Sequence, residues 1–377
     1  MSFSEKWQLC TVLALLDAAI LPSLRRGARQ LRTQVRRDIE HRKEDNVGSR
    51  RRKRQTFAHP ICRFAMTLPQ IVRLVLLSAL WGSMFLLVKY ALADFSPAEV
   101  AFFQAVIGAI GLFVIVSMQG GEARARLGDV LHRPGWALLL GALAIAAPFL
   151  LITLGELRVP SGLAGVLASM APMFIALFAP LLDPSMDINR RQGAGLVVGL
   201  LGVGLVVGVH LVGSFGQFLG ALALLGAAAS GALSSFVVKL QYKDKGVPAS
   251  TTSFFALSVA SLLTLPLALI TAPRELPGAR AVLAVIVLGL GCTALGYMLY
   301  YRLIDHVGEE RAALANYLTP AFALFYGMLL LGETLTIWAI LGLMLIIAGA
   351  EITLRGAKRR GSRSDVRSRY QIHPPFH

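Results

Sequence analysis

Charged side chains are scarce in this sequence. Only 15% of its 377 residues are Asp, Glu, Lys or Arg, whereas 55% are hydrophobic. That balance lies outside the range of soluble globular domains. The chain also contains about ten apolar runs of roughly 20 residues, the length that a helix needs to cross a bilayer. Because a soluble protein cannot bury so many such runs, the composition predicts a multi-pass membrane protein.

Motifs for metals and cofactors are missing as well. The three cysteines, Cys10, Cys62 and Cys292, have no paired spacing, and the seven histidines fall in tails, loops or a span end. These patterns predict neither a disulfide framework nor a metal site. A glycine-rich loop ending in Gly-Lys-Ser/Thr is also absent, so ATP is not expected to drive the protein. We expect no cofactor.

Positive charge is abundant only in the two tails. Residues 1–65 carry 15 Lys/Arg against 6 Asp/Glu, and residues 355–377 carry 7 against 1, while the middle of the chain is close to neutral. Basic segments beside membrane spans are explained by orientation and by anionic lipid. No basic module interleaved with aromatic residues accompanies them. The expected partners are therefore the lipid bilayer and a small-molecule substrate, and not nucleic acid.

The first 68 residues form a basic N-terminal extension. Its one apolar stretch, residues 9–21, is interrupted by Asp17 and is too short to span a membrane. A signal peptide is one interpretation, but its cleavage would leave an arginine-rich segment outside, against the usual charge bias. A polar arm is a second interpretation, and a mis-assigned start, with Met66 as the true one, is a third.

The distribution of charge between loops predicts the orientation. With the N-terminus inside, the loops on the inner side hold ten Lys/Arg and those on the outer side hold three. Positive residues collect on the cytoplasmic side of membrane proteins. We therefore expect a cell-membrane protein whose N- and C-termini are both cytoplasmic. The predicted spans are 71–91, 97–117, 135–153, 159–181, 192–211, 216–238, 249–271, 280–301, 312–331 and 336–354.

The chain repeats itself. Residues 170–180 read MAPMFIALFAP and residues 318–328 read LTPAFALFYGM; FLLVK at 85–89 is echoed by SFVVK at 235–239. These echoes divide the membrane part into two five-helix units, 71–211 and 216–354, followed by a basic cytoplasmic tail, 355–377. Because five is odd, the second unit enters the membrane inverted. The sequence thus predicts an all-α integral membrane protein of ten transmembrane helices in two inverted five-helix repeats, with a site between them near mid-membrane.

The two halves of the membrane part resemble EamA domains of the drug/metabolite transporter superfamily. SALWGSMFLLVKYAL (78–92) is similar to the family's first-helix pattern, and YMLYYRLIDHVGEERAALANYLTPAFALFYGMLLLGET (297–334) is similar to its most typical stretch. The resemblance implies a secondary transporter that moves a small metabolite by alternating access, often as an exporter. An amino acid, a nucleobase-like compound or a xenobiotic would fit. The first half departs from the pattern at Asp183-Pro184-Ser185, where Leu-Gly-Glu is common, and at Gln104, where arginine is common.

Polar and aromatic residues within spans are the candidate substrate-binding groups, because buried polar groups in a membrane tend to face a pathway. Pro172 and Pro320 would interrupt helices four and nine, as packing kinks or as gating bends. The candidate binding residues are Ser83, Gln104, Tyr297, Asn316, Trp81, Tyr300 and Tyr317.

Few charges lie near the predicted spans. Glu156 either carries a coupling proton or pairs with Arg158, and pairing is the favoured interpretation. Gly332 and Glu333 are typical of a turn and cap before the last helix, while Lys89, at a span end, can extend to the membrane surface. Four-residue spacing of small residues, as at Gly195 and Gly199, serves either internal packing or a homodimer.

Two other functional classes, an intramembrane enzyme and a non-transporting membrane scaffold, fit the sequence less well. An intramembrane enzyme would need an activated nucleophile, but Ser230 has no histidine in a later span to activate it. A non-transporting membrane scaffold is disfavoured by the inverted repeat. Among transporters, small drug/proton exchangers use a buried glutamate in the first helix. Residues 71–92 of this chain contain no Asp or Glu, so exchange of a cation for a proton by that route is not expected. We therefore expect a carrier and no enzymatic activity.

Overall fold

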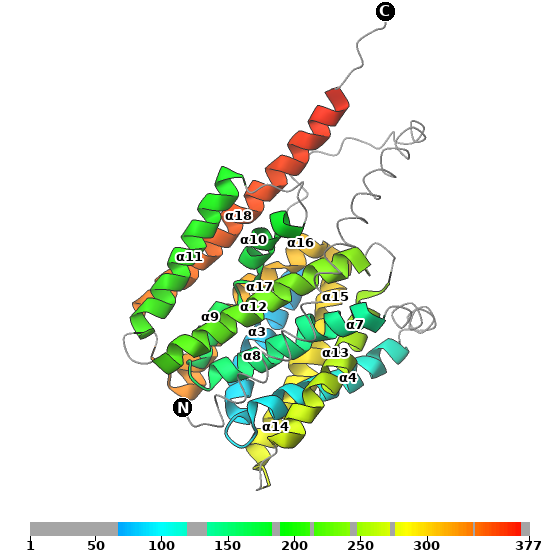
Figure 1. The fold of residues 1–377 in the computed structure, drawn as a ribbon, viewed down its shortest axis with the longest axis vertical. Helices are drawn as coiled ribbons and strands as arrows, with labels where there is room; N and C mark the ends of the chain where they lie inside the picture. The colour runs from blue at the N-terminus through cyan, green and yellow to red at the C-terminus, as the bar shows by residue number, and fades with distance from the viewer. Residues whose placement is uncertain are drawn as a thin grey trace, which may run out of the picture. The chain divides into compact units, whose positions relative to one another are not determined.

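The computed structural model describes residues 67–118, 134–182, 189–211, 215–241, 247–271, 276–334 and 336–370, and every regular element in these ranges is helical (Figure 1). Residues 65–177 and 189–377 form one compact unit, to which all contacts below belong. The second unit, 1–64 with 178–188, contributes only the end of one helix to the described part. Both the basic extension before residue 67 and Asp183-Pro184-Ser185 lie outside the described residues.

Ten helical spans follow one another in two sets of five. The first set is α3 (Leu68–Ala91), α4 (Pro97–Met118), α7 (Pro134–Gly141) with the π-helical η3 (Ala142–Ala146) and α8 (Ala147–Glu156), then α9 (Ser161–Ala168) with α10 (Ala171–Leu182), and α11 (Arg190–Leu211). The second set is α12 (Phe215–Gln241), α13 (Ala249–Ile270), α14 (Ala279–Val287) with the π-helical η5 (Leu288–Leu295) and α15 (Gly296–Val307), then the short α16 (Glu309–Ala312) with α17 (Leu314–Leu331), and α18 (Ile337–Tyr370).

The lengths and compositions of these helices suit a membrane. Among the described residues, eight spans are long and apolar enough to cross one. The 22-residue α11 and the apolar stretch Ile337–Thr353 of α18 complete the ten. The chain is thus an all-α multi-pass membrane protein of two inverted five-helix repeats, as predicted. Helix α18 continues through Tyr370, into the segment predicted as the tail.

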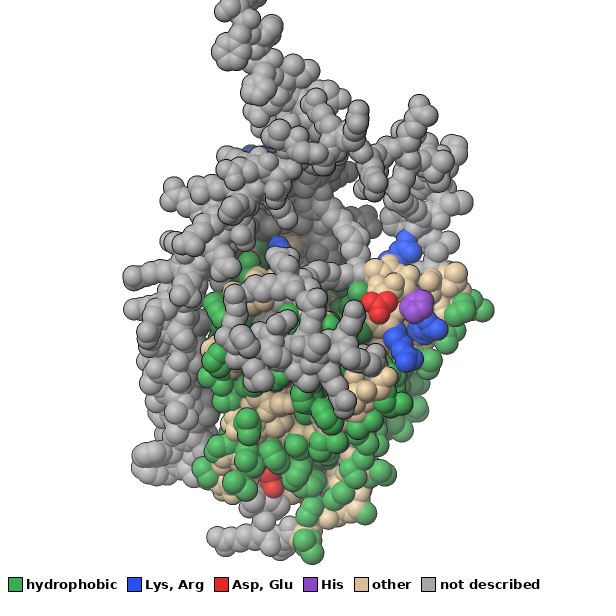
Figure 2. Space-filling model, turned by 90° about the vertical axis from the view of Figure 1, so that its right-hand side faces the viewer, with side chains coloured by type: hydrophobic (Ala, Val, Ile, Leu, Met, Phe, Trp, Pro, Cys, Tyr) green, Lys and Arg blue, Asp and Glu red, His purple; other side chains and the backbone are tan. Residues whose placement is uncertain are grey.

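Hydrophobic side chains also cover the outside of the molecule. In the coloured part of Figure 2 most side chains are hydrophobic, and the charged ones gather mainly at one edge. Leu200, Leu222, Leu262 and Leu329 are each more than half exposed. Such a surface would be costly in water but is the expected one against lipid tails.

The two repeats pack through counterpart helices. α4 contacts α13, α9 contacts α17, and α11 lies along α18 (Figure 1). In addition, the first helix of each repeat contacts the third span of the other: α3 packs on η5 and α15, and α12 packs on η3 and α8. This reciprocal arrangement is what a pseudo-twofold axis between inverted repeats requires.

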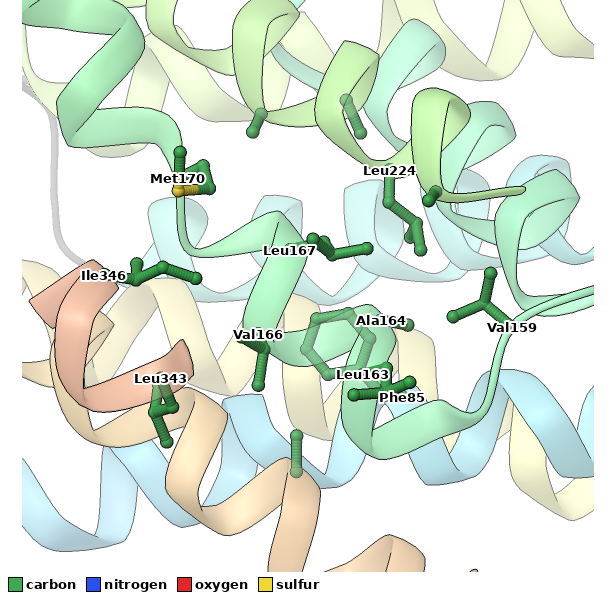
Figure 3. Packing of buried hydrophobic residues seen from close by; sticks show 14 of the residues in the cluster. Phe85, Val159, Leu163, Ala164, Val166, Leu167, Met170, Leu224, Leu343 and Ile346 are labelled. Atoms are coloured by element: carbon green, nitrogen blue, oxygen red, sulfur yellow. The ribbon is translucent and has the colours of Figure 1, made fainter. Parts of the chain in front are cut away.

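The short helix α9 lies at the centre of the largest buried cluster. All but the last of its residues are buried. Figure 3 shows Leu163, Val166 and Leu167 of α9 among side chains from several other helices, including Phe85 and Leu224. Burial on every side fixes the position of this helix, including its first turn.

Glycine allows α11 and α18 to lie close together. A methyl group on Gly202 would come within 2.7 Å of the Gly342 carbonyl oxygen, and one on Gly349 within 2.5 Å of the Gly199 nitrogen. Gly195 is equally close to Gly349 and Thr353. The small-residue spacing of the fifth span therefore serves packing within this chain.

The two repeated prolines occupy different settings. In the first repeat the fourth span is broken after Ala168, and Pro172 lies in the first turn of α10. In the second repeat Pro320 is buried inside α17, which runs without a break. The interruption predicted for both spans is found only at Pro172, because Pro172 follows a turn that ends the preceding helix.

Candidate functional site

A polar and aromatic cluster forms where the first two spans of one repeat meet the second and third spans of the other. We call it the central cluster. Its members are Trp81 and Ser83 of α3, Gln104 of α4, Ser253 of α13, and Cys292, Thr293, Tyr297, Tyr300 and Tyr301 of η5 and α15. None of these side chains carries a formal charge, so the cluster offers hydrogen bonds and aromatic faces.

Gln104 connects the two repeats in this cluster. Its side chain is 2% exposed. Its Nε2 atom donates to Thr293 Oγ1 at 3.3 Å, and the Thr293 hydroxyl donates to the Leu288 carbonyl at 3.0 Å. Nearby, Ser83 Oγ lies 3.6 Å from Cys292 Sγ. These pairs join α3 and α4 to η5.

Aromatic side chains form the other half of the cluster. The rings of Tyr297 and Tyr301 stack with centroids 5.9 Å apart, and Trp81 lies against Tyr300 at 5.2 Å. The hydroxyl of Tyr301 also bonds to Ser253 Oγ on α13. The successive tyrosines of one helix thus contact α3 on one side and α13 on the other.

Two predicted binding residues lie elsewhere. Asn316 is exposed in the first turn of α17, and Tyr317 packs against the hydrophobic cluster around α9. The structure therefore groups Ser83, Gln104, Trp81, Tyr297 and Tyr300, but neither Asn316 nor Tyr317. The α17 prediction relied on polarity alone, whereas the direction of each side chain depends on how the helix is rotated.

The π-helical segments occupy matching places in the two third spans. In η3, the Leu143 carbonyl accepts a hydrogen bond from Ser230 Oγ of α12 at 2.8 Å. In η5, Cys292 Sγ donates to the Leu80 carbonyl of α3 at 3.2 Å. Ser230, considered above as a nucleophile, thus donates its proton to a backbone carbonyl. π-Helical turns are rare in proteins, and those that occur are often found at functional sites.

A second group of polar residues surrounds the connection between α8 and α9. Lys89 Nζ donates to the carbonyl oxygens of Glu156 and Val159, the latter at 3.2 Å. Glu333 accepts from the backbone N–H groups of Ser161 at 2.6 Å and Gly162 at 2.9 Å. Lys89 is therefore engaged inside the protein rather than extended to its surface.

Two predictions are corrected at this connection. Glu333 follows the left-handed Gly332 (φ 68°), as the predicted turn requires, but its carboxylate caps α9 rather than the last helix. Glu156 does not hydrogen-bond to Arg158: it is fully buried, and neither carboxyl oxygen has a hydrogen-bond partner among the described residues. The helix that Glu333 caps is distant in sequence, so the residues next to Glu333 could not reveal this contact.

The sequence pattern does not indicate Ser253 or Cys292 as site residues, and it assigns no role in a site to Thr293 or Lys89. Lys89 had a signal, because it ends the repeated FLLVK and SFVVK segments. Ser253 and Cys292 had none beyond lying in spans. Among the described residues, no group of three His, Cys, Asp or Glu side chains could hold a metal ion.

Comparisons with known proteins agree with this architecture. The model of the EamA-like transporter family matches residues 69–208 and 218–355. The uncharacterized transporter YdfC of Bacillus subtilis is 28% identical, over 74% of this chain and 88% of that protein. A probable terminal-alkyne amino-acid exporter of Streptantibioticus cattleyicolor is 26% identical, over 77% of this chain and 95% of that protein.

A solved crystal structure shares the fold, with a TM-score of 0.55 and 18% identity over 78% of this chain and 99% of that one. Two family matches, one on each five-helix repeat, together cover most of the chain. With the inverted arrangement of its helices, this protein belongs to the EamA-like transporter family.

Proposed function

We propose that the protein is a secondary carrier that exports a small polar metabolite of zero net charge, such as an amino acid, by alternating access. The observation that carries the proposal is the central cluster. It contains hydrogen-bonding and aromatic side chains from both repeats and no charged side chain. Inverted-repeat carriers bind their substrate where the repeats meet, and polar groups there fix its orientation.

The substrate class follows from the chemistry of these groups. Gln104, Thr293 and the tyrosine hydroxyls both donate and accept hydrogen bonds, so they suit a ligand with donors and acceptors of its own. The stacked tyrosines add an apolar face for its carbon skeleton. One relative is named a probable amino-acid exporter, which supports this class and the outward direction.

Orientation belongs to the same proposal. The distribution of Lys and Arg between the loops favours cytoplasmic termini. The α8–α9 connection then faces outside, and the hydroxyl contact between Tyr301 and Ser253 lies toward the cytoplasm. The central cluster is reached from one side at a time as the repeats move about their shared axis.

Comparison of export by cells with and without the protein tests the proposal. Extracellular amino acids and other small metabolites are measured by mass spectrometry, and we expect at least one neutral metabolite to accumulate outside only when the protein is present. The site is then tested with Tyr297→Ala and the matched control Asn316→Ala. Tyr297→Ala should reduce export at equal protein level, and Asn316→Ala should not. Equal export by both variants would contradict this placement of the site.

A further inference from the structure

Opposite charges hold the two helix ends at the α8–α9 connection. We call this group the α8–α9 clasp: Lys89 and Glu333 with the backbone groups that they bind. Lys89 binds carbonyl oxygens at the C-terminal end of α8, and Glu333 binds N–H groups at the N-terminal end of α9. Each charge is the one that the helix dipole favours at that end.

The clasp also connects the repeats. Lys89 and α9 belong to the first repeat, whereas Glu333 follows α17 of the second. Close approach of α9 and α17 is possible because both carry glycine there. A methyl group on Gly162 would lie 3.0 Å from Leu324, and Gly327 faces the Glu333 carboxylate. Loss of the Glu333 contact would therefore remove a hydrogen-bonded link between the repeats at this end.

Glu156 lies within the clasp, and its own carboxyl group has no partner. Its side chain is 0% exposed, and neither oxygen accepts a hydrogen bond from the described residues. An ionised carboxylate is costly in such a position, because neither water nor a hydrogen bond stabilises it. A protonated carboxyl group avoids most of that cost.

Lys89 and Glu333 are the charged groups of the clasp: Lys89 binds the backbone carbonyl of Glu156 itself, and Glu333 binds the N–H groups of Ser161 and Gly162. The other ionisable side chains of α3 are Arg73, near the start of that helix, and Tyr90, whose hydroxyl donates to the Leu330 carbonyl at 3.4 Å. Helix α9 and segment η3 have no ionisable side chain, Glu99 of α4 is bonded to the Ser96 N–H at 2.8 Å, and Lys239 is in the last turn of α12. Arg158 of the connection does not bond to Glu156. Lys89 and Glu333 are thus the charged groups whose contacts a change of charge at Glu156 would alter.

We propose that Glu156 reversibly binds a proton, and that its protonation keeps the α8–α9 clasp closed. On binding, a hydronium ion gives its proton to a carboxylate oxygen: one O–H bond of the hydronium breaks, the O–H bond of the carboxyl group forms, and a water molecule is left. On release, the carboxylate attracts Lys89 away from the carbonyl oxygens and repels Glu333 from Ser161 and Gly162. The clasp opens, and by linkage, opening lowers the affinity for the proton. This proposal deepens the proposed function, because it makes the proton the coupling ion of the carrier. Only that role in transport rests on the proposed function; the proton site and the clasp do not.

Infrared spectroscopy of the purified full-length protein in lipid nanodiscs tests the proton site. Acidification should produce the carbonyl stretch of a protonated carboxyl group, which Glu156→Gln should remove. Glu99→Gln is the matched control, since Glu99 is also buried but has a hydrogen-bond partner, and it should keep the band. Retention of the full band in folded Glu156→Gln would overturn the proposal.

Two further variants test the coupling and remain informative if Glu156→Gln does not fold. Glu333→Gln should move the midpoint of the Glu156 band to lower pH, because a repelling anion is removed. Lys89→Met should move it to higher pH, because an attracting cation is removed. Shifts in the same direction, or none, would contradict the clasp.

Hydrogen exchange measured by mass spectrometry tests closure itself. After correction for intrinsic rates, the amides of residues 161–168 should exchange faster as the pH rises in the unmodified protein. In Glu156→Gln, which mimics the protonated form, their protection should be independent of pH. Identical pH dependence in both proteins would exclude the switch. Neither readout uses a transported substrate, so these results are independent of whether the proposed export is found.

Discussion

At the scale of single residues, Gln104 illustrates how one substitution changes the chemistry of a site. The family pattern commonly has arginine at this position in the second span, whereas this chain has a neutral amide that is buried and bonded to Thr293. A buried guanidinium would need anionic partners, and the central cluster has no anion. The neutral Gln104 is therefore in keeping with the proposed substrate without net charge.

Replacement of Gln104 by leucine tests this role. Folding should persist, since the Thr293 hydroxyl keeps its bond to the Leu288 carbonyl. Loss of one hydrogen bond to substrate, about 1 kcal/mol, corresponds to a roughly fivefold slower initial rate of export. The rate is measured in vesicles with the metabolite identified in cells, and Ser258→Ala, which loses only a bond within α13, is the control. Unchanged export by Gln104→Leu would remove Gln104 from the site.

At the scale of elements, close helix packing and π-helical turns shape this molecule. Side-chain donors reach backbone carbonyls at both π-helical segments, from Ser230 to Leu143 and from Cys292 to Leu80. In the fifth pair of spans the helices meet through glycine instead. Helix association in a membrane lacks the hydrophobic effect, so such bonds and close contacts carry more of the packing.

The contrast between two glycines gives an element-scale prediction. Gly349→Ala places a methyl group against the backbone of α11, and we expect about 1–3 kcal/mol of destabilisation from overpacking. Gly204→Ala is the control, because nothing lies within 4 Å of the added methyl group. It should be neutral or stabilising by up to about 1 kcal/mol. Thermal unfolding in detergent, followed by tryptophan fluorescence, should show a lower midpoint only for Gly349→Ala; equal midpoints would argue against tight α11–α18 packing.

Ser230→Ala tests the π-helical contact. The change removes the donor to the Leu143 carbonyl, and the expected loss of stability is about 1 kcal/mol, within the range for a hydrogen bond between membrane helices. The same unfolding measurement applies. Ser235→Ala, which loses only a bond to the Gly231 carbonyl within α12, should leave the midpoint unchanged, and an equal effect of both variants would assign no special role to η3.

At the scale of the whole molecule, the inverted repeats and the loop charges together predict the topology. Loops rich in Lys and Arg alternate with loops that contain few of these residues along the ten spans. An even number of spans returns the chain to the side of the membrane on which it started. This prediction puts the α8–α9 clasp on the outer side of the membrane and the two basic tails on the cytoplasmic side.

Reporter fusions measure this topology. Fusions after residues 125 and 245 should give the cytoplasmic signal, and fusions near residues 275 and 333 the external one, because Lys and Arg are retained on the cytoplasmic side. A cytoplasmic signal at 333 would place the clasp on the inner side, and an external signal at 245 would exclude the predicted orientation.

The sequence by itself determined the class, the repeat and the family of this protein. Apolar runs of membrane-spanning length can fold only as helices in lipid, since every backbone polar group must be satisfied internally. Repeated segments such as FLLVK and SFVVK then indicate two repeats. Because each repeat has an odd number of helices, the second one is inverted. These features are local or periodic, and they can be read along the chain.

Only the tertiary structure decided which residues meet. Gln104 and Thr293 are 189 positions apart, and Glu333 caps a helix that begins 172 positions before it. The rotation of each helix about its axis placed Asn316 on the surface and left the Glu156 carboxyl without a hydrogen-bond partner among the described residues. In a helix that is apolar on all sides, hydrophobic periodicity gives little indication of the inward face. Packing against other helices selects that face, and it therefore selects the residues of the site.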